Sequence, residues 1–538
     1  MLVFCFIITL ASCGQNTTSN LTTAATSATT SATTQTQESS FLSKDKVTLK
    51  TLIYADPGTV YDDNEMAKWL EEKTNVHIEW NIIQDDGEGI NVDLIVASGD
   101  LPDVMLTYLP TAKQLRYASE GIIIPVDAMF EQFGTYTKQL FSYYPDGRSI
   151  ITAPDGKIYG LPMLEECYHC CWQQKAWINQ TWLTNLGLTM PVTTDDFYNV
   201  LKSFKTGDPN GNGKPDEVPL ALGDWCGNLD GFVMDAFIYS SDGQNRLTLN
   251  GGVVGAAYDQ PAYREGLKFL NKLYEEGLIY KDSVSGIELE EYPTMTLVEN
   301  TDAISLGVGL NGGPPGDAGN EEAGSPTTNY VTIPPLTGPE GYSSAAFYPP
   351  FVWSVKFITK DCANPEVAFK WLDLLASEEV SLWQIFGIEG KDWERAKPGD
   401  VGLDGQPGVI RNLLPPDGEN GGIEMGYFWP KKIFNGWVAD PNRPNWIEYR
   451  LAQETMKNYE GKQPKEILPV LVVDQTDAIE YDELQGTINA YVTESVLAFV
   501  RGDMNIDNDW DTYIQKLKTK GLDRYLEITQ KTFDRMYK

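Results

Sequence analysis

The chain of 538 residues contains only two histidines, His77 and His169, and no run of lysine or arginine. Two histidines leave few places for histidine-based acid–base catalysis. The GxSxG, P-loop and HExxH patterns of common catalytic sites are also absent from the sequence. The 76 acidic and 41 basic residues give a formal net charge of −35, which would repel a phosphate backbone. The sequence therefore argues against nucleic acid as a partner.

Long apolar runs are missing as well. Beyond the N-terminus, no stretch approaches the roughly 18 consecutive apolar residues that span a bilayer. Residues 1–12 are almost wholly apolar but too short to cross as a stable helix, so they predict the core of a signal peptide. They end at Leu10-Ala11-Ser12-Cys13-Gly14, which resembles the bacterial lipobox. This resemblance implies a signal peptide over residues 1–13 and lipidation of Cys13, although the first lysine is Lys44.

The next segment, residues 14–40, is rich in Thr, Ser, Ala, Asn and Gln, and Glu38 is its only charged residue. Such a composition cannot bury enough apolar surface to offset the entropy lost on ordering. We therefore expect a flexible tether. A lipidated cysteine followed by a flexible spacer would hold a folded body outside a bacterial cell, anchored to the membrane.

The folded part opens with an α/β pattern. Residues 47–54 and 76–83 alternate like strands, and a helical apolar spacing lies between them. A third strand is predicted at residues 103–108. Such repeats predict an α/β fold with a largely parallel sheet. Ligands bind beyond the carboxyl ends of the strands in open α/β sheets, so Asp56 and Tyr108 are candidates for a binding surface, although both could be plain turn residues.

Further along the chain, three helices are predicted: one capped by Thr193, one that stops at Gly277 and one that begins at Asn364-Pro365. Their aromatic residues recur at helical spacing, which indicates core positions rather than a cofactor site. The Gly- and Pro-rich stretches 307–339 and 397–422 predict loops or lobe connections.

Residues 208–217 form the strongest local motif. Oxygen-bearing side chains alternate with Gly211 and Gly213, which permit a tight turn. Calcium takes six to eight oxygen ligands, and in an EF-hand the twelfth position supplies a bidentate glutamate. Here that position is Pro219, so we expect an incomplete EF-hand that binds a structural Ca²⁺; the alternative is a solvated acidic turn. The candidate ligands are Asp208, Asn210, Asn212, the carbonyl of Lys214, Asp216, and Glu217 in place of the missing glutamate.

Five fragments, in this order, carry a resemblance to a known family: ASGDLPD (97–103), DGKIYGLP (155–162), WLTNLGL (182–188), LYEEGLI (273–279) and GIEGKDW (387–393). The chain resembles the extracellular solute-binding lipoproteins of ABC transporters, in the maltose-binding-like group and its long branch of alginate-oligosaccharide and other oligosaccharide binders. The calcium loop of that branch is similar to residues 208–217.

The resemblance implies a two-lobed, type II periplasmic-binding-protein-like fold with a hinge. One lobe would hold residues 41–165 and 352–398, and the other residues 166–351 and 399–538 with the calcium loop. It implies a monomer that is not an enzyme, captures an oligosaccharide between the lobes and delivers it to the permease subunits of an ABC importer. Because no basic cluster offsets the net charge of −35, we expect a neutral oligosaccharide.

Sugars present apolar C–H faces and a rim of hydroxyls, so their sites pair aromatic platforms with carboxylates and amides. Residues near turns, or near the points where the chain would pass from one lobe to the other, fit this description. For each tryptophan among them, a place in the hydrophobic core is an equal alternative. They are Asp56, Tyr108, Glu165, Glu166, Tyr168, Trp172, Asp224, Trp225, Asn311, Trp353, Trp429 and Trp437.

Outside the signal segment and Cys13, five cysteines remain: Cys167, Cys170, Cys171, Cys226 and Cys362. The segment 166–171 resembles a zinc-ligand cluster, although it lacks a second spaced pair. A disulfide, for example between Cys171 and Cys226, and a free buried thiol are the alternatives.

Two other functions stay open. A secreted glycoside hydrolase needs only two suitably spaced carboxylates and an aromatic cleft, and 76 acidic residues could supply them. A calcium-dependent adhesin that binds intact polysaccharide is the third possibility.

Overall fold

The computed structural model describes residues 41–538 except 57, 86–88, 224–227, 286–293, 295–296, 299–304, 317–324, 415–420 and 440–445. The signal segment, the tether and Cys13 therefore lie outside the described residues. No helix in the described part of the chain combines the length and the apolar character needed to cross a membrane.

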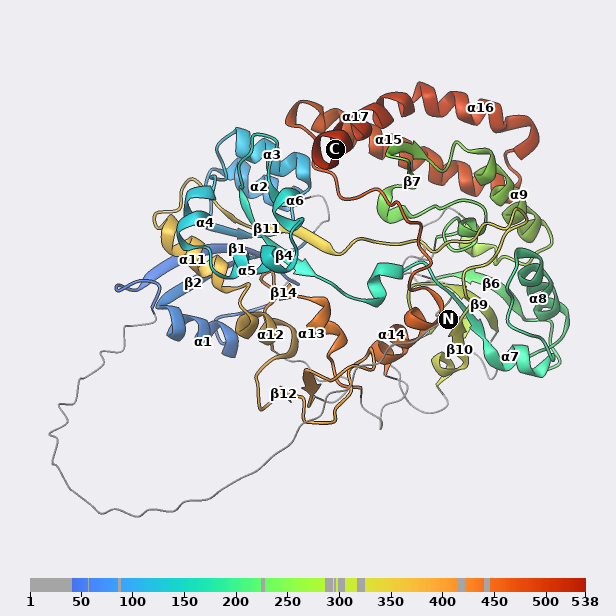
Figure 1. Ribbon diagram of the computed structural model, residues 1–538, viewed down its shortest axis with the longest axis horizontal. Helices are drawn as coiled ribbons and strands as arrows, with labels where there is room; N and C mark the ends of the chain where they lie inside the picture. The colour runs from blue at the N-terminus through green and yellow to red at the C-terminus, as the bar shows by residue number, and fades with distance from the viewer. Residues whose placement is uncertain are drawn as a thin grey trace, which may run out of the picture. The chain divides into compact units, whose positions relative to one another are not determined.

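The first of two main sheets has the strand order β14-β4-β11-β3-β1-β2. Its strands β1, β2 and β3 are parallel, whereas β11 runs antiparallel to both β3 and β4. The strands are β1 (Val47–Tyr54), β2 (Val76–Ile83), β3 (Val104–Leu106), β4 (Gly160–Glu165), β11 (Phe351–Ile358) and β14 (Phe428–Trp429). The helices grouped with this sheet in Figure 1 are α1 (Glu65–Thr74), α2 (Ile90–Ser98), α3 (Thr111–Ser119), α4 (Asp127–Phe133), α5 (Tyr136–Tyr143), α6 (Gly147–Ile151), α11 (Pro365–Leu374) and α12 (Glu378–Phe386).

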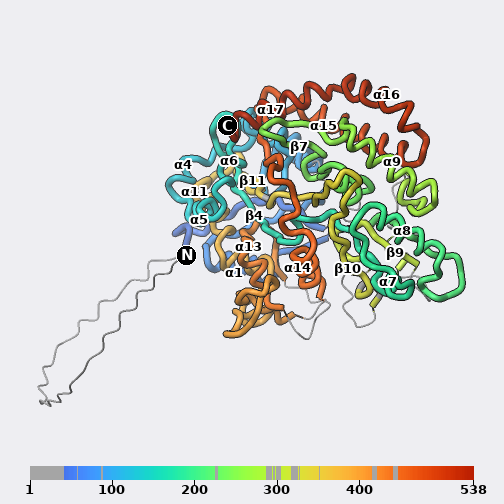
Figure 2. The backbone as a smooth tube through the Cα atoms, turned by 45° about the vertical axis from the view of Figure 1, so that its right-hand side comes forward, coloured from blue at the N-terminus to red at the C-terminus, as the bar shows by residue number. Residues whose placement is uncertain are grey.

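The second sheet has the order β10-β5-β9-β6 and its own hydrophobic core. Its strands are β5 (Ala176–Asn179), β6 (Val218–Leu222), β9 (Leu306–Leu310) and β10 (Tyr330–Thr332). Its helices are α7 (Gln180–Asn185), α8 (Thr194–Thr206), α9 (Pro261–Glu275), α14 (Ile447–Asn458), α15 (Gln475–Arg501), α16 (Ile506–Thr519) and α17 (Leu522–Tyr537). The described residues also form two hairpins, β7 (Leu247–Asn250) with β8 (Val253–Ala256) and β12 (Trp393–Arg395) with β13 (Ile410–Asn412), and the short helix α13 (Lys431–Asn435). In Figure 2 the red helices α15 and α16 lie along α9.

Two sheets with separate cores confirm the prediction of a two-lobed α/β fold. The chain passes from the first sheet to the second after β4, returns before β11, and passes to the second lobe again between β14 and α14. One assignment needs correction: β14, which we expected in the second lobe, pairs with β4 of the first sheet. A strand of two residues carries no hydrophobic periodicity that sequence reasoning could detect. The lobe boundaries otherwise stay a prediction.

Local signals account for several elements. Thr193 caps α8 through the backbone N–H of Asp196, and the Asp196 side chain bonds back to the Thr193 N–H. Such a cap contributes about 1 kcal/mol. The predicted apolar face of α8, which includes Phe197 and Phe204, is buried.

The prediction of loops or lobe connections over residues 307–339 is wrong at β9 and β10, which lie within this stretch. A Cβ on Gly307 would meet the Phe204 ring at 2.4 Å, and one on Gly309 would meet Pro315 at 2.6 Å. The glycines of β9 therefore allow the close approach of neighbouring side chains. From composition alone, these glycines would be assigned to a loop.

Asp235 leads to a prediction about stability. It is 3% exposed, and its carboxyl oxygen accepts bonds from the Ser240 backbone N–H at 3.0 Å and the Ser344 hydroxyl. Burial raises its pKa to about 8. The folded chain therefore keeps a proton that the unfolded chain loses near pH 3.8, and stability falls by up to about 1.4 kcal/mol per pH unit as pH rises between those two values.

The neutral variant Asp235→Asn should lack this contribution. Urea unfolding of both proteins across this pH range should show the variant gaining stability relative to the native chain as pH rises. Parallel pH profiles for the two proteins would contradict the assignment.

Candidate functional site

A cleft of about 920 Å³ lies between elements of the two lobes. The first lobe supplies the turn after β3, the start of α3 and the start of β11. The second lobe supplies residues near 243–247 and 348–350 and the α15 segment near 481–489. This volume is near the upper end of the range for small-molecule sites. The cleft can therefore hold a ligand of several linked rings.

Two aromatic side chains form one part of the cleft wall. Tyr108 and Trp353 contact each other edge to face, with ring centroids 5.6 Å apart. They are 39% and 37% exposed, which is unusual for large aromatic groups in this chain. The Tyr54 hydroxyl donates to the Tyr108 carbonyl at 3.3 Å and holds the turn after β3 in place. The structure thus brings two predicted residues from distant strands to one surface.

Two amide side chains of the second lobe also line the cleft. The Gln244 Oε1 accepts from the Tyr239 hydroxyl at 2.9 Å, but its buried Nε2 has no hydrogen-bond partner among the described residues. The Asn489 Nδ2 donates to Asn245 Oδ1 at 2.8 Å, whereas its buried Oδ1 has no such partner. A buried polar group without a partner costs free energy. Both residues line the cleft, but the two unpaired atoms are themselves covered, so each amide must turn toward the cleft to give a hydroxyl-rich ligand one donor and one acceptor.

Sequence reasoning missed both amides. Gln244 lies in the short turn Asp242–Gln244. The only sequence feature that could have indicated a site there is a glycine next to amide residues. Asn489 lies within the 27-residue helix α15, and nothing in its neighbourhood distinguishes it from a surface residue.

The turn that carries Gln244 is held in a strained conformation. Asn245 and Arg246 have φ values of 52° and 57°, which cost free energy in residues other than glycine. Arg246 makes two hydrogen bonds to Asp230, one of 2.9 Å from Nη2 to Oδ1. Burial alone would raise the pKa of Asp230, but Arg246 and the Tyr263 hydroxyl lower it. This buried ion pair fixes the turn from behind the cleft wall.

The charge of the cleft is low. Asp482 is the one carboxylate among the lining residues, and no lysine, arginine or histidine belongs to that described set. A site for an anionic ligand needs cationic or multiple N–H donors. The lining therefore suits an uncharged ligand.

Several predicted residues do not line this cleft. Glu165 accepts from the Tyr427 hydroxyl at 2.9 Å, and burial raises its pKa. Glu166 accepts from the Lys431 backbone N–H at 2.7 Å. Their neighbours Tyr168 and Trp172 are buried core residues, in edge contact with each other.

The remaining candidates are scattered. Trp429 and Trp437 pack against Phe386, with ring centroids 6.1 and 5.0 Å from it. Asn311 is buried, and its carbonyl accepts from the Trp177 indole N–H. Asp56 is exposed after β1 and is not part of the cleft lining. Asp224 and Trp225 lie outside the described residues.

The predicted calcium loop forms a compact turn. Gly211 and Gly213 both have φ of +71°, and the Gly213 N–H donates to Asp208 Oδ2 at 3.2 Å. The Asn210 and Asn212 amides both contact the Asp216 carboxylate. The Glu217 Oε1 is buried without a hydrogen-bond partner among the described residues, and burial and then Asp216 and Asp208 raise the pKa of Glu217. These oxygens fit a hard cation such as Ca²⁺.

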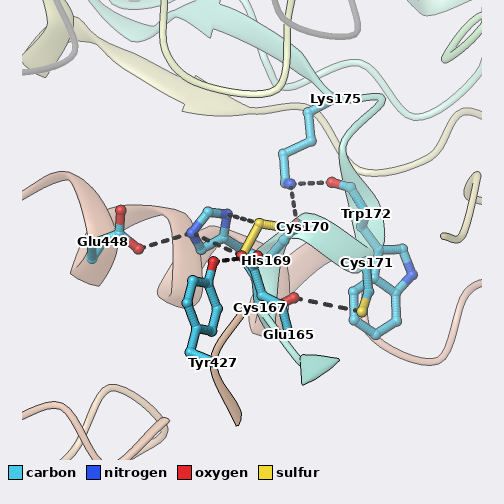
Figure 3. Close-up of a disulfide and its surroundings, with 9 residues drawn as sticks. All are labelled: Glu165, Cys167, His169, Cys170, Cys171, Trp172, Lys175, Tyr427 and Glu448. Atoms are coloured by element: carbon cyan, nitrogen blue, oxygen red, sulfur yellow. Dashed lines mark hydrogen bonds and ion pairs between the residues drawn. A yellow bond between two sulfur atoms is a disulfide. The ribbon is translucent and has the colours of Figure 1, made fainter. Parts of the chain in front are cut away.

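The cysteine prediction needs a correction. Cys167 and Cys170 form a disulfide, whereas Cys171 and Cys362 are free thiols. The suggested Cys171–Cys226 pairing is therefore wrong, and the suggested free thiol is present. The three-residue spacing of Cys167 and Cys170 within one tight turn is what lets them reach each other. Figure 3 shows this disulfide beside His169 and Glu448.

A family model described as bacterial extracellular solute-binding protein matches residues 55–381. The chain is 29% identical over 548 residues to the fructooligosaccharide ABC transporter substrate-binding protein FusA of Streptococcus pneumoniae serotype 4 (strain ATCC BAA-334 / TIGR4), covering 98% of this chain and 96% of that protein. It is 26% identical over 375 residues to lipoprotein LipO of Bacillus subtilis (strain 168), covering 67% of this chain and 70% of that one.

A solved structure is also similar. The FusA EF-hand mutant of S. pneumoniae in complex with fructo-nystose has a TM-score of 0.72 and 27% sequence identity, covering 91% of this chain and 99% of that chain.

Proposed function

From the premise that the chain belongs to the family of bacterial extracellular solute-binding proteins, we propose that it captures a neutral oligosaccharide in the cleft between its lobes. It then delivers this ligand to the permease of an ABC importer. The observation that carries the proposal is the chemistry of the cleft: two exposed aromatic rings, two half-satisfied amides and no cationic side chain among the described lining residues.

The two kinds of lining group match the two surfaces of a sugar. Tyr108 and Trp353 can stack on the apolar C–H faces of sugar rings. The Gln244 donor and the Asn489 acceptor can pair with hydroxyls, each of which both donates and accepts. Relatives support this ligand class, because FusA is named for fructooligosaccharides. The absence of lysine, arginine and histidine from the described lining supports a neutral rather than an acidic sugar.

Capture works by a shift between two states. The chain crosses between the lobes after β4, before β11 and between β14 and α14, so the lobes can hinge about these crossings. A ligand that contacts both lobes favours the closed state by its difference in affinity for the two states. The permease can then distinguish the closed, loaded protein from the open one.

We propose three further features of the protein. Cys13 carries a lipid that anchors the monomer to the outside of the cell membrane, and the similarity to lipoprotein LipO supports this. The loop of residues 208–217 holds a structural Ca²⁺, and the EF-hand named in the FusA structure supports that site. The protein releases its ligand unchanged.

A thermal-shift panel tests the proposed ligand class. The panel would contain nystose, neutral manno- and xylo-oligosaccharides, and oligogalacturonate. We expect at least one neutral member to raise the melting temperature, because a ligand that binds only the folded state stabilises it. Stabilisation by oligogalacturonate alone would contradict the proposal, and so would new reducing ends in the incubated sugars, which would indicate a hydrolase.

The proposed contact between Gln244 and a sugar hydroxyl predicts how a single substitution changes the affinity for any sugar that binds. Gln244→Met keeps the length of the side chain but removes the Nε2 donor. Affinity should fall about tenfold, because a ligand hydroxyl loses its partner in the cleft. Isothermal titration calorimetry would measure this loss. The exposed Gln406→Met is the matched control, and an equal loss in both variants would refute the role of Gln244.

The calcium loop predicts an effect of chelation. Removing Ca²⁺ with EGTA should lower the melting temperature, since a cation at 100 times its Kd stabilises the folded state by about 2.7 kcal/mol. Added calcium should restore it. The variant Asp216→Asn, with one oxygen ligand fewer, should respond to EGTA less than the native chain. A native melting curve that EGTA leaves unchanged would rule out a structural calcium.

A further inference from the structure

A second group of side chains that can bind a metal precedes the calcium loop in the sequence. Ligand atoms of Cys167, His169 and Cys170 all lie within 4.8 Å of one another. The group belongs to the segment that links β4 of the first lobe to β5 of the second. Cys167 and His169 are buried, at 4% and 3% exposure, so bulk water has little access. In the structure the two sulfurs are joined as a disulfide.

The spacing of these atoms suits a tetrahedral zinc ion once the disulfide is open. Zinc binds sulfur at about 2.3 Å and imidazole nitrogen at about 2.0 Å, so neighbouring S and N ligands are about 3.5 Å apart. The Cys167 Sγ lies 3.7 Å from His169 Nε2. The Cys170 Sγ lies 3.8 Å from the other ring nitrogen, Nδ1; because an imidazole gives one nitrogen to an ion, this sulfur must shift toward Nε2 when zinc binds there. Reduction would let the two sulfurs separate to the roughly 3.8 Å that a shared zinc requires.

The carboxylate of Glu448 lies beside this group on a different element and would be the fourth ligand. Its Oε2 lies 2.9 Å from His169 Nε2, on helix α14. In Figure 3 the Glu448 carboxylate points at the imidazole ring from the side opposite Lys175. A zinc ion would replace the proton that these two atoms share, with a modest increase in their separation. Two cysteines, one histidine and one carboxylate are all ligands that zinc accepts.

The nearby charges favour a cation in this position. Two thiolates and the Glu448 carboxylate would bring three negative charges to one ion of charge +2. The buried Lys175 ammonium lies close by and donates to the His169 carbonyl at 3.1 Å and to the Trp172 carbonyl. It offsets the remaining negative charge. Cys171 does not belong to the set, because its thiol donates to the Cys167 carbonyl and in Figure 3 it lies on the Trp172 side.

We infer that the reduced chain binds one Zn²⁺ through Cys167, Cys170, His169 and Glu448. Reduction is a thiol–disulfide exchange: two molecules of a small thiol give two cysteine thiols and one oxidised dimer of the reductant. Zinc then displaces the two thiol protons and forms two zinc–sulfur bonds. The site ties the lobe crossing to α14 of the second lobe. It does not depend on the sugar ligand.

The test titrates the full chain with Zn²⁺, in excess calcium to fill the calcium loop, before and after reduction with a phosphine. We expect one equivalent to bind the reduced protein and none to bind the oxidised one, as followed by competition with a chromogenic chelator. Co²⁺ in place of zinc should show the absorption of thiolate-to-cobalt charge transfer.

Single substitutions test whether zinc binds at these four residues or elsewhere on the protein. Cys167→Ser and His169→Ala should each weaken zinc binding at least tenfold, whereas the neighbouring Cys171→Ser should bind like the native chain. Should Cys167→Ser fail to fold, Glu448→Gln keeps the disulfide and should still weaken binding to the reduced protein. Failure of the reduced native chain to bind zinc, or equal losses in Cys171→Ser and Cys167→Ser, would overturn the proposal.

Discussion

Replacing Arg246 by methionine should lower the free energy of unfolding by about 3–5 kcal/mol, because it leaves the Asp230 carboxylate buried without its counter-charge. Asp230 is 4% exposed, and its other side-chain partner is the Tyr263 hydroxyl at 2.7 Å. Methionine has a similar length and the same cost at positive φ, so the change isolates the charge. Chemical denaturation measures the difference.

The matched control is Arg395→Met. Arg395 pairs with Glu378 at 3.0 Å, but both side chains are about half exposed, and such surface pairs contribute about 0–1 kcal/mol. The Arg246→Met variant should also bind sugar more weakly, since the turn that carries Gln244 and Asn245 loses its support. Similar losses of stability in Arg246→Met and Arg395→Met would contradict the role assigned to the buried pair.

The second large effect concerns the cleft aromatics. Trp353→Ala should weaken oligosaccharide binding by about 2 kcal/mol or more, which is about 30-fold in Kd. The indole is exposed in the cleft and is the partner of Tyr108, so its removal takes away both a stacking surface and the support of a second ring. Stability should change by less than about 1 kcal/mol, because the side chain is not in a core.

Tyr342→Ala provides the comparison for this result. Tyr342 is 36% exposed, close to the value for Trp353, but it does not line the cleft. Calorimetry should therefore show native affinity for that variant. Native affinity in Trp353→Ala would show that the sugar binds elsewhere, for example near Trp429 and Trp437.

Local patterns predicted the first lobe well. The strands at residues 47–54 and 76–83 are β1 and β2 with the same bounds, because alternating side chains and flanking turns coincide there. The predicted cap at Thr193 likewise starts α8. The failure at β9 has a physical cause: the glycines of Leu306–Leu310 are needed because Phe204 and Pro315 pack where a Cβ would lie. That requirement exists only in the folded chain.

The site was only partly predictable, because some of its features arise only in the folded chain. Tyr108 could be found because it follows a strand end, and Trp353 because it lies at a lobe crossing. Gln244 and Asn489 could not be found, since an amide becomes distinctive only when burial leaves one of its ends without a partner. Glu165 and Glu166 were good candidates by position, yet in the fold they bond to Tyr427 and to the Lys431 backbone.

A crystal structure of the protein with a neutral oligosaccharide selected by the thermal-shift panel tests the central claim most directly. We expect an intact sugar between the lobes, with ring faces against Tyr108 and Trp353 and hydroxyls paired with the Gln244 Nε2 and the Asn489 Oδ1. An intact sugar bound outside this cleft, or a cleaved product inside it, would show that the protein does not capture sugar in this way.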